Sequence, residues 1–580
     1  MLTIKPLPQN MSKLPVDFRH PNRALIQGCF REEVEVAGQT RNFISYLPEN
    51  IEYCQRCIVV CPPSDENPLE FLEISGLKEL ADRQKLYIFL MEKEGSAWKT
   101  DGTDADFMNA VYVKIQARDY YVTMQDNIYA LGIGDGAGIA QTAASRMSGD
   151  WSGLMSIGDL DAGFVQEGLP GMKEREQGNL ELQVSAQKSQ LPVWMVFSSM
   201  EGAQNKAVTE YWKEQNQVLD SVFSGEGADY IWMPTPVRMT DETNDEKVAQ
   251  VRVTTGRSDA VPEMIETMWN YIGSLRRHRG QGSKNLRYFK DPAAYGAALH
   301  TIEVDGMSRI WYEYVPDSCT PDKTWPVVVT MHGRGGTAET FFDITGLANV
   351  AQQRRFIAVF PQAGIHQQKK DGLKNILLWN GFYDDKHVDD VKFIRVMIDD
   401  IKKRLPVDTE RIYACGQSSG GMMTDMLCNH AGDIFAACAS WSATENAVSQ
   451  KTVMEESKDL VPYMLMYGDR DFLCASKEEV PGFPYRPLDG IRKDLEHKME
   501  KYGCSRENVE SWETYPIRWW CYKNAEQVPM LTVGVVNNMV HANFPEQSRI
   551  SYDQFFAHFR KASDGTLYYR NKPVFESKGE

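Results

Sequence analysis

The chain has 580 residues and is too long for one hydrophobic core. Hydrophobic residues make up 42% of it, which is typical of a globular protein. Its formal net charge of −17 argues against nucleic acid and anionic membrane surfaces as partners. No apolar stretch marks a secretory signal at the N-terminus or approaches the roughly 18 residues of a membrane span. The cysteines number 11, an odd and scattered set that is typical of reduced thiols, so we predict a cytoplasmic location.

The first strand with a clear signal is the β-branched run at residues 58–60. Cys54, Cys57 and Cys61 surround this run. A zinc site needs four ligands, and no second pair of ligands lies nearby in the sequence. We therefore predict that these cysteines flank and line a buried strand and do not hold a metal.

Residues 128–136 predict a strand, a sharp turn and the start of a helix. The spacing Gly132-x-Gly134-x-x-Ala137 resembles a dinucleotide-binding fingerprint. That motif belongs to the first βαβ unit of a domain, whereas several predicted strands precede it here. We therefore predict no cofactor.

Residues 276–284 are rich in arginine and contain glycine. A binding patch is one interpretation of this segment, and a solvated linker within an acidic chain is the favoured one. We predict one domain at residues 1–280, a linker at 281–294 and a second domain at 295–580.

The second half again alternates strand-like and helix-like segments. Residues 327–331 and 356–360 predict buried strands, and residues 341–353 have a helical pattern. Residues 389–404 place apolar side chains on one helical face. Strands that alternate with helices indicate an α/β fold, in which a mostly parallel sheet is flanked by helices.

A predicted strand ends in the sequence Gly416-x-Ser418-x-Gly420, and a predicted helix follows. This G-x-S-x-G pattern is typical of a sharp turn that exposes a nucleophilic serine. The two glycines relieve the crowding of such a turn. We predict Ser418 as the nucleophile.

Residues 332–336 (H-G-R-G-G) directly follow a predicted buried strand. A loop of this type supplies a backbone N–H group that stabilises the oxyanion of a tetrahedral intermediate. We predict the N–H of Arg334 as this donor, with Gly333 as the alternative, and the N–H of Ser419 as the second donor. We predict no metal at the site.

An acid and then a base are expected after the later strands. Asp469 and Asp471 both follow a predicted strand, and the G-x-x-D spacing favours Asp471, with Asp469 as the alternative. His541 follows the last predicted strand and would act as the base, while the aspartate fixes its tautomer. His558 lies in a helical pattern, which suits a structural role better.

Segments of the first half match segments of the second half in the same order. Residues 35–41 match residues 303–309, and residues 71–77 match residues 341–347. Matching blocks with a period this long indicate a duplicated domain and not a short-repeat array.

The first half lacks the groups that the second half would use. Gly134 stands at the place of Ser418 and has no side chain that could attack a substrate. Residues 62–63 are prolines at the place of the oxyanion loop, and proline has no N–H to donate. Residues 198–200 and 254–258 supply neither the acid nor the histidine. We predict that the first domain is catalytically silent.

The second half, from about residue 300 to 565, resembles the α/β-hydrolase esterases of the polyhydroxybutyrate depolymerase and feruloyl esterase type. The motifs that carry this resemblance are the H-G-R-G-G loop, Trp379-Asn380, Asp389-Asp390-Val391-x-Phe393-Ile394, the serine turn, Phe435-Ala436-Ala437, Gly468-x-x-Asp471 and His541-x-x-Phe544-Pro545. The last motif departs from the family's usual H-x-W-P. The resemblance implies two tandem α/β-hydrolase-like domains and hydrolysis of carboxylic esters through an acyl-serine, without metal or cofactor.

The substrate is less well specified than the chemistry. We predict a small-molecule ester, with a feruloyl-like aromatic ester as one class. Trp379 and Trp441 are candidates for an aromatic pocket, and core packing is the alternative for both. A serine peptidase or amidase on the same scaffold, or a non-catalytic binding module, are the alternative functions. We expect the first domain to support the second or to form a homo-oligomer contact.

Overall fold

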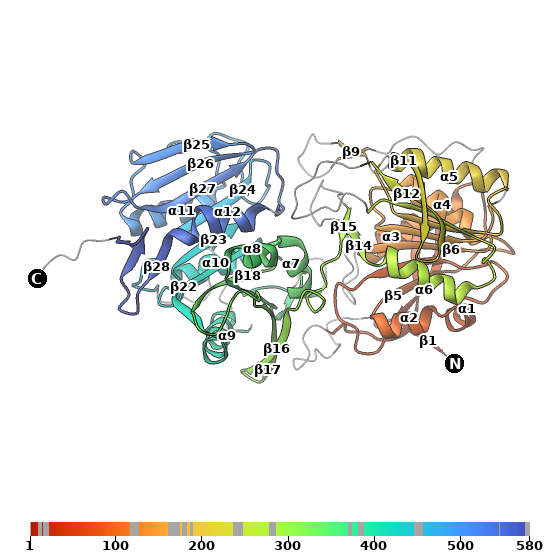
Figure 1. Ribbon diagram of the computed structural model, residues 1–580, viewed down its shortest axis with the longest axis horizontal. Coiled ribbons are helices and arrows are strands. Elements are labelled where there is room, and N and C mark those ends of the chain that lie inside the picture. The colour runs from red at the N-terminus through yellow and green to blue at the C-terminus, as the bar shows by residue number, and fades with distance from the viewer. Residues whose placement is uncertain are drawn as a thin grey trace, which may run out of the picture. The chain divides into compact units, whose positions relative to one another are not determined.

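The computed structural model describes residues 2–9, 14, 23–116, 127–160, 174–176, 183–185, 189–235, 248–277, 286–368, 374–380, 388–445, 456–544 and 546–574. The chain divides into two compact units with a boundary between Phe289 and Lys290, within the segment that was predicted as a linker. In Figure 1 the colour runs from red to yellow-green over the first unit and from green to blue over the second. Each unit has its own sheet and its own hydrophobic core.

The first unit is built on an 11-stranded sheet with the order β1-β2-β3-β5-β4-β6-β7-β10-β13-β12-β11. Its strands are β1 (Ile4–Lys5), β2 (Gly28–Val36), β3 (Gln39–Leu47), β4 (Cys57–Cys61), β5 (Tyr87–Met91), β6 (Ile128–Ile133), β7 (Gly153–Ile157), β10 (Val193–Phe197), β11 (Val218–Gly225), β12 (Ala228–Pro234) and β13 (Val251–Thr255). The block from β5 to β13 is parallel, and antiparallel strands flank it on both sides. Two hairpins lie outside the sheet, β8 (Glu174–Glu176) with β9 (Gln183–Ser185) and β14 (Leu275–Arg277) with β15 (Leu286–Tyr288).

Helices cover both faces of this first sheet. They are α1 (Pro68–Ile74), α2 (Leu77–Gln84), α3 (Thr103–Gln116), α4 (Gly136–Arg146), α5 (Ala203–Asn216) and α6 (Val261–Ile272). One core cluster joins the sheet to α3, α4 and α5, and the other joins it to α1, α2 and α6. Strand β4 alternates between the two, because Cys57, Val59 and Cys61 face the first cluster and Ile58 and Val60 face the second. The prediction of a buried strand lined by cysteines is confirmed.

The second unit is built on a 10-stranded sheet with the order β16-β17-β19-β18-β22-β23-β24-β27-β26-β25. Its strands are β16 (Ala298–Val304), β17 (Met307–Tyr314), β18 (Trp325–Met331), β19 (Ile357–Pro361), β22 (Val407–Gln417), β23 (Ala437–Trp441), β24 (Tyr463–Gly468), β25 (Val509–Thr514), β26 (Ile517–Lys523) and β27 (Pro529–Val536). The block from β19 to β27 is parallel, as in the first unit. The two sheets therefore have the same strand order, apart from the additional edge strand β1.

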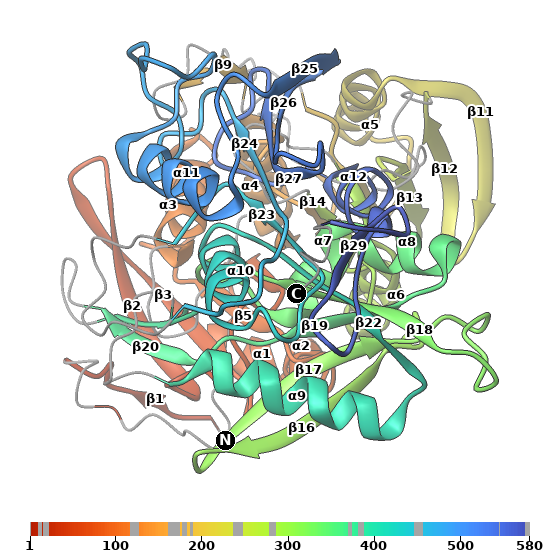
Figure 2. The ribbon, with the colours of Figure 1, turned by 90° about the vertical axis from the view of Figure 1, so that its left-hand side faces the viewer.

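The helices of the second unit also lie on both sides of its sheet. They are α7 (Ala338–Thr345), α8 (Leu347–Arg354), α9 (Asp390–Arg404), α10 (Ser419–His430), α11 (Asp489–Tyr502), α12 (Glu546–Gln554) and the short 3₁₀ helix η3 (Phe556–His558). Figure 2 shows α9, α10 and α11 on one side of β22–β24, and α7, α8 and α12 on the other. The remaining strands are β20 (Ile365–Gln368), β21 (Lys374–Leu377), β28 (Phe559–Lys561), β29 (Leu567–Tyr569) and β30 (Lys572–Pro573). The predicted fold class, two tandem α/β domains with mostly parallel sheets, is confirmed.

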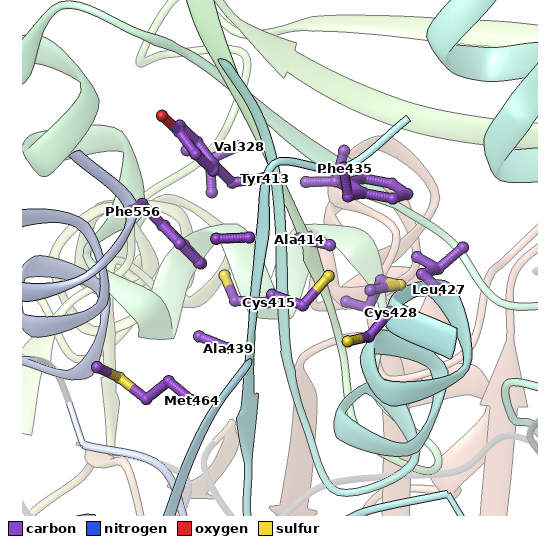
Figure 3. Close-up of a cluster of buried hydrophobic side chains, with 14 of the residues drawn as sticks. Val328, Tyr413, Ala414, Cys415, Leu427, Cys428, Phe435, Ala439, Met464 and Phe556 are labelled. Carbon is purple, nitrogen blue, oxygen red and sulfur yellow. The ribbon is translucent and has the colours of Figure 1, made fainter. Parts of the chain in front are cut away.

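The central strand β22 is buried on both faces just before it reaches the serine turn. Figure 3 shows Tyr413 and Cys415 of this strand within a cluster of buried apolar side chains. The ring of Tyr413 stacks on Phe556 with centroids 4.9 Å apart, and its hydroxyl donates to the carbonyl of Phe559. A strand fixed in this way gives the turn that follows it a rigid base.

Two expectations about local structure are wrong. Residues 341–353 do not form one helix, because Gly346 adopts φ = 65° and separates α7 from α8. Arg276 and Arg277 are not solvated, since both are buried in β14. Arg277 donates to the carbonyls of Ser148, Trp151 and Gln190, and these acceptors compensate for the loss of water. Residues 278–284 of the same basic segment lie outside the described residues.

Three further properties bear on the chemistry of the chain. Within the described ranges, none of the helices combines the length and the apolar character that a bilayer crossing requires. In the same ranges, no three His, Cys, Asp or Glu side chains are grouped closely enough to hold a metal ion. All 11 cysteines are free thiols.

Candidate active site

Ser418 lies in a strained turn between β22 and α10. Its backbone angles are φ = 56° and ψ = −119°, a region that non-glycine residues rarely occupy. The turn needs the flanking glycines for steric reasons. A Cβ atom on Gly416 would overlap the carbonyl oxygen of Gly420, and one on Gly420 would overlap that of Met331. The turn therefore packs tightly against β18 and presents the serine hydroxyl at the end of the strand.

The structure brings together the three side chains that were predicted as nucleophile, base and acid. The Nε2 atom of His541 lies 2.8 Å from Ser418 Oγ, and Nδ1 lies 3.0 Å from each carboxylate oxygen of Asp471. An ionised carboxylate only accepts, so Nδ1 carries the ring proton and Nε2 is free to accept the serine proton. This arrangement is that of a general base held in the reactive tautomer.

Asp471 is fixed by its backbone surroundings and is fully buried. Its Oδ1 atom accepts the N–H of Leu473 at 2.9 Å, and its own N–H donates to the carbonyl of Gly468. Burial, and then the charge of this carboxylate, raises the pKa of the adjacent Cys474 thiol well above its usual range, so the thiol stays neutral. Asp469, the alternative acid, makes no hydrogen bond to His541 in the described structure.

His332 holds the loop that follows β18 and takes no place in the relay. Its Nε2 atom accepts the N–H of Ala363 at 3.0 Å, so its Nδ1 atom bears the proton and donates to the carbonyl of Gly333 at 2.8 Å. The indole N–H of Trp379 donates to the carbonyl of His332 at 2.9 Å. These bonds set the path of the backbone beside the nucleophile.

The loop leaves unpaired backbone donors next to Ser418. The N–H groups of Gly335 and Gly336 donate to the carbonyls of Leu377 and Gly333. By contrast, the N–H groups of Gly333 and Arg334 have no partner among the residues that the structure describes. A Cβ atom built on Gly333 would lie 3.4 Å from that of Ser418, so this part of the loop lies against the serine. The choice of Arg334 over Gly333 stays a prediction.

The second predicted oxyanion donor is the N–H of Ser419, the first residue of α10. Amides of the first helical turn have no partner within the helix, and they point along the axis toward its N-terminal end. Ser419 directly follows the nucleophile, and in turns of this type the N–H after the nucleophile is one of the oxyanion donors. The role of Ser419 as the second donor stays a prediction.

Trp379 and Trp441 are placed in the core. Both side chains are fully buried, and their indole N–H groups donate to the His332 carbonyl and to Ser551 Oγ. The carbonyl of Trp441 accepts the N–H of Ser418 at 2.9 Å. Side chains without exposed surface have no face to offer a substrate, so their burial gives the predicted aromatic pocket no support.

An aromatic side chain that the sequence analysis did not single out lies at the site. Phe472 directly follows the acid, is 51% exposed, and sets its ring edge-on to the His541 imidazole with centroids 5.8 Å apart. Leu473 beside it is also 51% exposed. Phe544, the aromatic of the altered H-x-x-F-P motif, instead packs against the core. The sequence signal that could have identified this side chain is the pair of large apolar residues, Phe472 and Leu473, directly after the predicted acid.

The corresponding edge of the first sheet has a different set of side chains. Gly134 occupies the turn between β6 and α4, and the prolines at residues 62–63 follow β4. The N–H of Ser64 donates to the side chain of Asp135 at 2.8 Å. The described residues of the first unit include no histidine.

Comparison with known proteins gives partial matches. The model of the Prolyl oligopeptidase family matches residues 379–471. Feruloyl esterase B of Thermothelomyces thermophilus is 34% identical over 131 residues, which are 23% of this chain and 43% of that enzyme. Feruloyl esterase B of Neurospora crassa is 30% identical over 141 residues, 23% of this chain and 44% of that enzyme. The chain spans less than half the length of these relatives.

Among solved structures, an acetyl xylan esterase from Aspergillus awamori is 12% identical to this chain. The match covers 45% of this chain and 99% of that one, with a TM-score of 0.33.

Proposed function

We propose that the second unit is a serine carboxylic ester hydrolase. The observation that carries the proposal is the continuous hydrogen-bonded path from Ser418 through His541 to Asp471. The unpaired N–H groups beside the serine add a site for the oxyanion. The matching feruloyl esterases support ester hydrolysis as the reaction.

The reaction would proceed through an acyl-serine. Ser418 Oγ attacks the ester carbonyl carbon while His541 Nε2 takes the hydroxyl proton. Backbone N–H groups bind the oxyanion of the tetrahedral intermediate, and each such donor is worth on the order of 3 kcal/mol. His541 then returns the proton to the departing alcohol. In the second half-reaction it deprotonates water, which attacks the acyl-serine and releases the acid. Asp471 stays ionised throughout and stabilises the imidazolium.

We propose a small ester as the substrate, with a feruloyl-like aromatic ester as the favoured class. Phe472 is an exposed apolar side chain next to His541, and the equally exposed Leu473 follows it in the chain, so the acyl group or the alcohol can pack on this loop. An aromatic substrate adds an edge or face contact with the ring of Phe472.

We also propose that the first unit is a catalytically silent counterpart of the second. The shared strand order and the replacement of the serine by Gly134 support this proposal. A silent unit would then support its neighbour in the chain or provide a homo-oligomer contact.

Labelling with a fluorophosphonate tests whether the chain is an enzyme or a binding module. The full chain should be labelled at Ser418, and Ser418→Ala should lose the label. Ser199→Ala, which removes an exposed serine of the first unit, is the matched control and should keep it. A chain that no fluorophosphonate labels, although folded, would contradict the proposal.

Substrate panels separate an esterase from a peptidase or amidase, which the Prolyl oligopeptidase match keeps as the second candidate. We expect turnover of p-nitrophenyl acetate and methyl ferulate, with little cleavage of peptide anilides. The opposite ranking would make the peptidase the better description, because the same relay serves both reactions.

A further inference from the structure

The first unit contains a cavity of about 720 Å³ that the proposed hydrolysis does not use. Its walls come from the hairpin β11–β12, from β13 and from α6. The lining includes apolar side chains from the hairpin (Phe223, Ile231 and Met233), from the neighbouring strand β10 (Trp194) and from α6 (Tyr271). We propose that this cavity binds a small carboxylic acid with an aromatic body, and that Arg252 binds its carboxylate.

Arg252 is the cationic side chain in the lining of the cavity and is only 4% exposed. Its Nε atom donates to the side-chain oxygen of Gln250 and its Nη2 atom to Glu226, both at 2.8 Å. Its Nη1 atom is buried and has no hydrogen-bond partner in the described structure. A buried guanidinium N–H without an acceptor is costly, so an acceptor on a bound ligand would relieve that cost.

Aromatic rings hold the guanidinium of Arg252 in a fixed orientation. Its central carbon lies 3.7 Å from the ring centroid of Tyr271 and 4.9 Å from that of Trp194. The hydroxyl of Tyr271 donates to the carbonyl of Val248 at 2.6 Å, which fixes that ring in turn. A pre-oriented fork of N–H donors suits a planar carboxylate.

The second unit has no arginine at the position that corresponds to Arg252. In the first sheet Arg252 pairs with Trp194, and at the same register of the second sheet Thr532 pairs with Met464. Thr532 is also buried, and its hydroxyl contacts the sulfur of Cys521. The same sheet is therefore built without a cation at this position, which favours a ligand-binding role for Arg252.

Glu226 accepts a hydrogen bond from one nitrogen of the Arg252 guanidinium, and a ligand can displace it. Its side chain is 75% exposed although it pairs with the buried Arg252. Its backbone has φ = 52° and lies between Gly225 and Gly227, which also have positive φ, so the turn holds the carboxylate at the guanidinium. A ligand carboxylate that displaces this side chain would bind Nη2, and after a small shift of the side chains that cover Nη1 it would also bind that atom, which Glu226 leaves unpaired.

The apolar part of the lining defines the body of the ligand. Phe223 is 51% exposed and lines the cavity, so a flat ring can pack on it without displacing core side chains. The aromatic side chains of the lining and its buried cation together favour an aryl carboxylate over inorganic phosphate.

Isothermal titration calorimetry of the full chain with benzoate and cinnamate tests the proposal. The enzyme is first treated with a fluorophosphonate, or carries Ser418→Ala and is saturated with a neutral ester, so that the second unit contributes no signal. We expect binding with one site per chain, and no binding of benzamide or inorganic phosphate. Because binding is measured without turnover, this result does not depend on the proposed hydrolysis.

Two variants act in opposite directions. Glu226→Gln removes the competing carboxylate at an exposed position, and we expect benzoate to bind several-fold more tightly. Arg252→Met should weaken binding by about tenfold or more, since one charge-assisted pair is lost. If Arg252→Met does not fold, Glu226→Gln still decides the question. The proposal is overturned if neither acid binds, if benzamide or phosphate binds as well as benzoate, or if Glu226→Gln leaves the affinity unchanged.

Discussion

The two strand-to-helix turns of the molecule have nearly the same backbone and different chemistry. Gly134 has φ = 60° and Ser418 has φ = 56°. At both turns a Cβ atom on the glycine two residues later, Gly136 or Gly420, would overlap a carbonyl oxygen of the neighbouring strand. The sharp turn with positive φ is therefore a property of the fold, and it does not by itself identify a catalytic serine. The hydroxyl, the imidazole and the carboxylate make the difference.

The supports around the two turns also correspond. In the first unit Arg41 pairs with Asp104 at 2.8 Å, and in the second unit Arg309 pairs with Asp390 at 2.6 Å. Each aspartate also accepts a backbone N–H at 2.7 Å, from Lys99 and from Asn380 respectively. All four ion-pair side chains are buried.

In both units a tryptophan directly precedes the residue whose N–H binds the aspartate. This tryptophan fixes the loop that follows β4 in the first unit and β18 in the second. The indole of Trp98 donates to the carbonyl of Pro62 at 2.7 Å, as that of Trp379 does to His332. Features that both units keep serve the fold, whereas features of the second unit alone are candidates for catalysis.

The largest expected effect concerns the side chain at the two turns. Ser418→Ala should reduce kcat for p-nitrophenyl acetate by about a million-fold, because the relay loses its nucleophile. Adding Gly134→Ser to Ser418→Ala should restore nothing, since the described residues of the first unit offer no histidine. Steady-state assays of both variants check this. Recovered activity in the double variant would show that the first unit is not silent.

The next effect concerns the buried ion pairs. Asp390→Ala should destabilise the second unit by about 3–5 kcal/mol, because it leaves Arg309 buried without its partner. Asp104→Ala should destabilise the first unit by a similar amount through Arg41. Urea unfolding followed by esterase activity and by tryptophan fluorescence distinguishes the two units. Equal loss of activity in both variants would mean that the units do not unfold separately.

The parallel sheets, the turn and the identity of the relay residues could be predicted because their signals are local. Apolar runs mark the central strands, and Ser418, Asp471 and His541 each follow one of them. The parallel order of these strands brings their ends to one edge.

Other features depend on tertiary partners that the sequence does not show. Arg277 looked like part of a solvated linker, but three carbonyls accept its hydrogen bonds. The second unit has a similar contact, in which Lys561 donates to the carbonyl of Gly432. Lys561 lies 284 positions after Arg277, and Gly432 lies 284 positions after Ser148, the acceptor of Arg277. Trp379 likewise looked like a pocket residue, and its role in the loop is visible only from its bond to His332.

A smaller effect is expected when Trp379 or its counterpart Trp98 loses the indole N–H. Trp379→Phe leaves the buried His332 carbonyl without its donor, which costs about 1–3 kcal/mol. The loop then shifts beside Ser418, and kcat/KM should fall about tenfold, since 1.4 kcal/mol is a factor of ten. Trp98→Phe is the matched control, because it makes the same change at Pro62 and should leave kcat/KM unchanged. Equal kinetic effects would show that stability alone explains the loss.

The smallest expected effect concerns Phe472, which has no aromatic counterpart in residues 198–202 after β10 of the first unit. Phe472→Ala removes a half-exposed ring, so the fold should keep its stability while an aromatic substrate loses a contact of about 0.5–1.5 kcal/mol. We expect KM for methyl ferulate to rise about two- to tenfold and KM for p-nitrophenyl acetate to change less. Leu473→Ala, which removes an equally exposed aliphatic side chain, is the control for general loss of apolar surface. If Phe472→Ala lowers kcat for both esters and leaves both KM values unchanged, the ring positions His541, which it contacts edge-on, and does not bind the substrate.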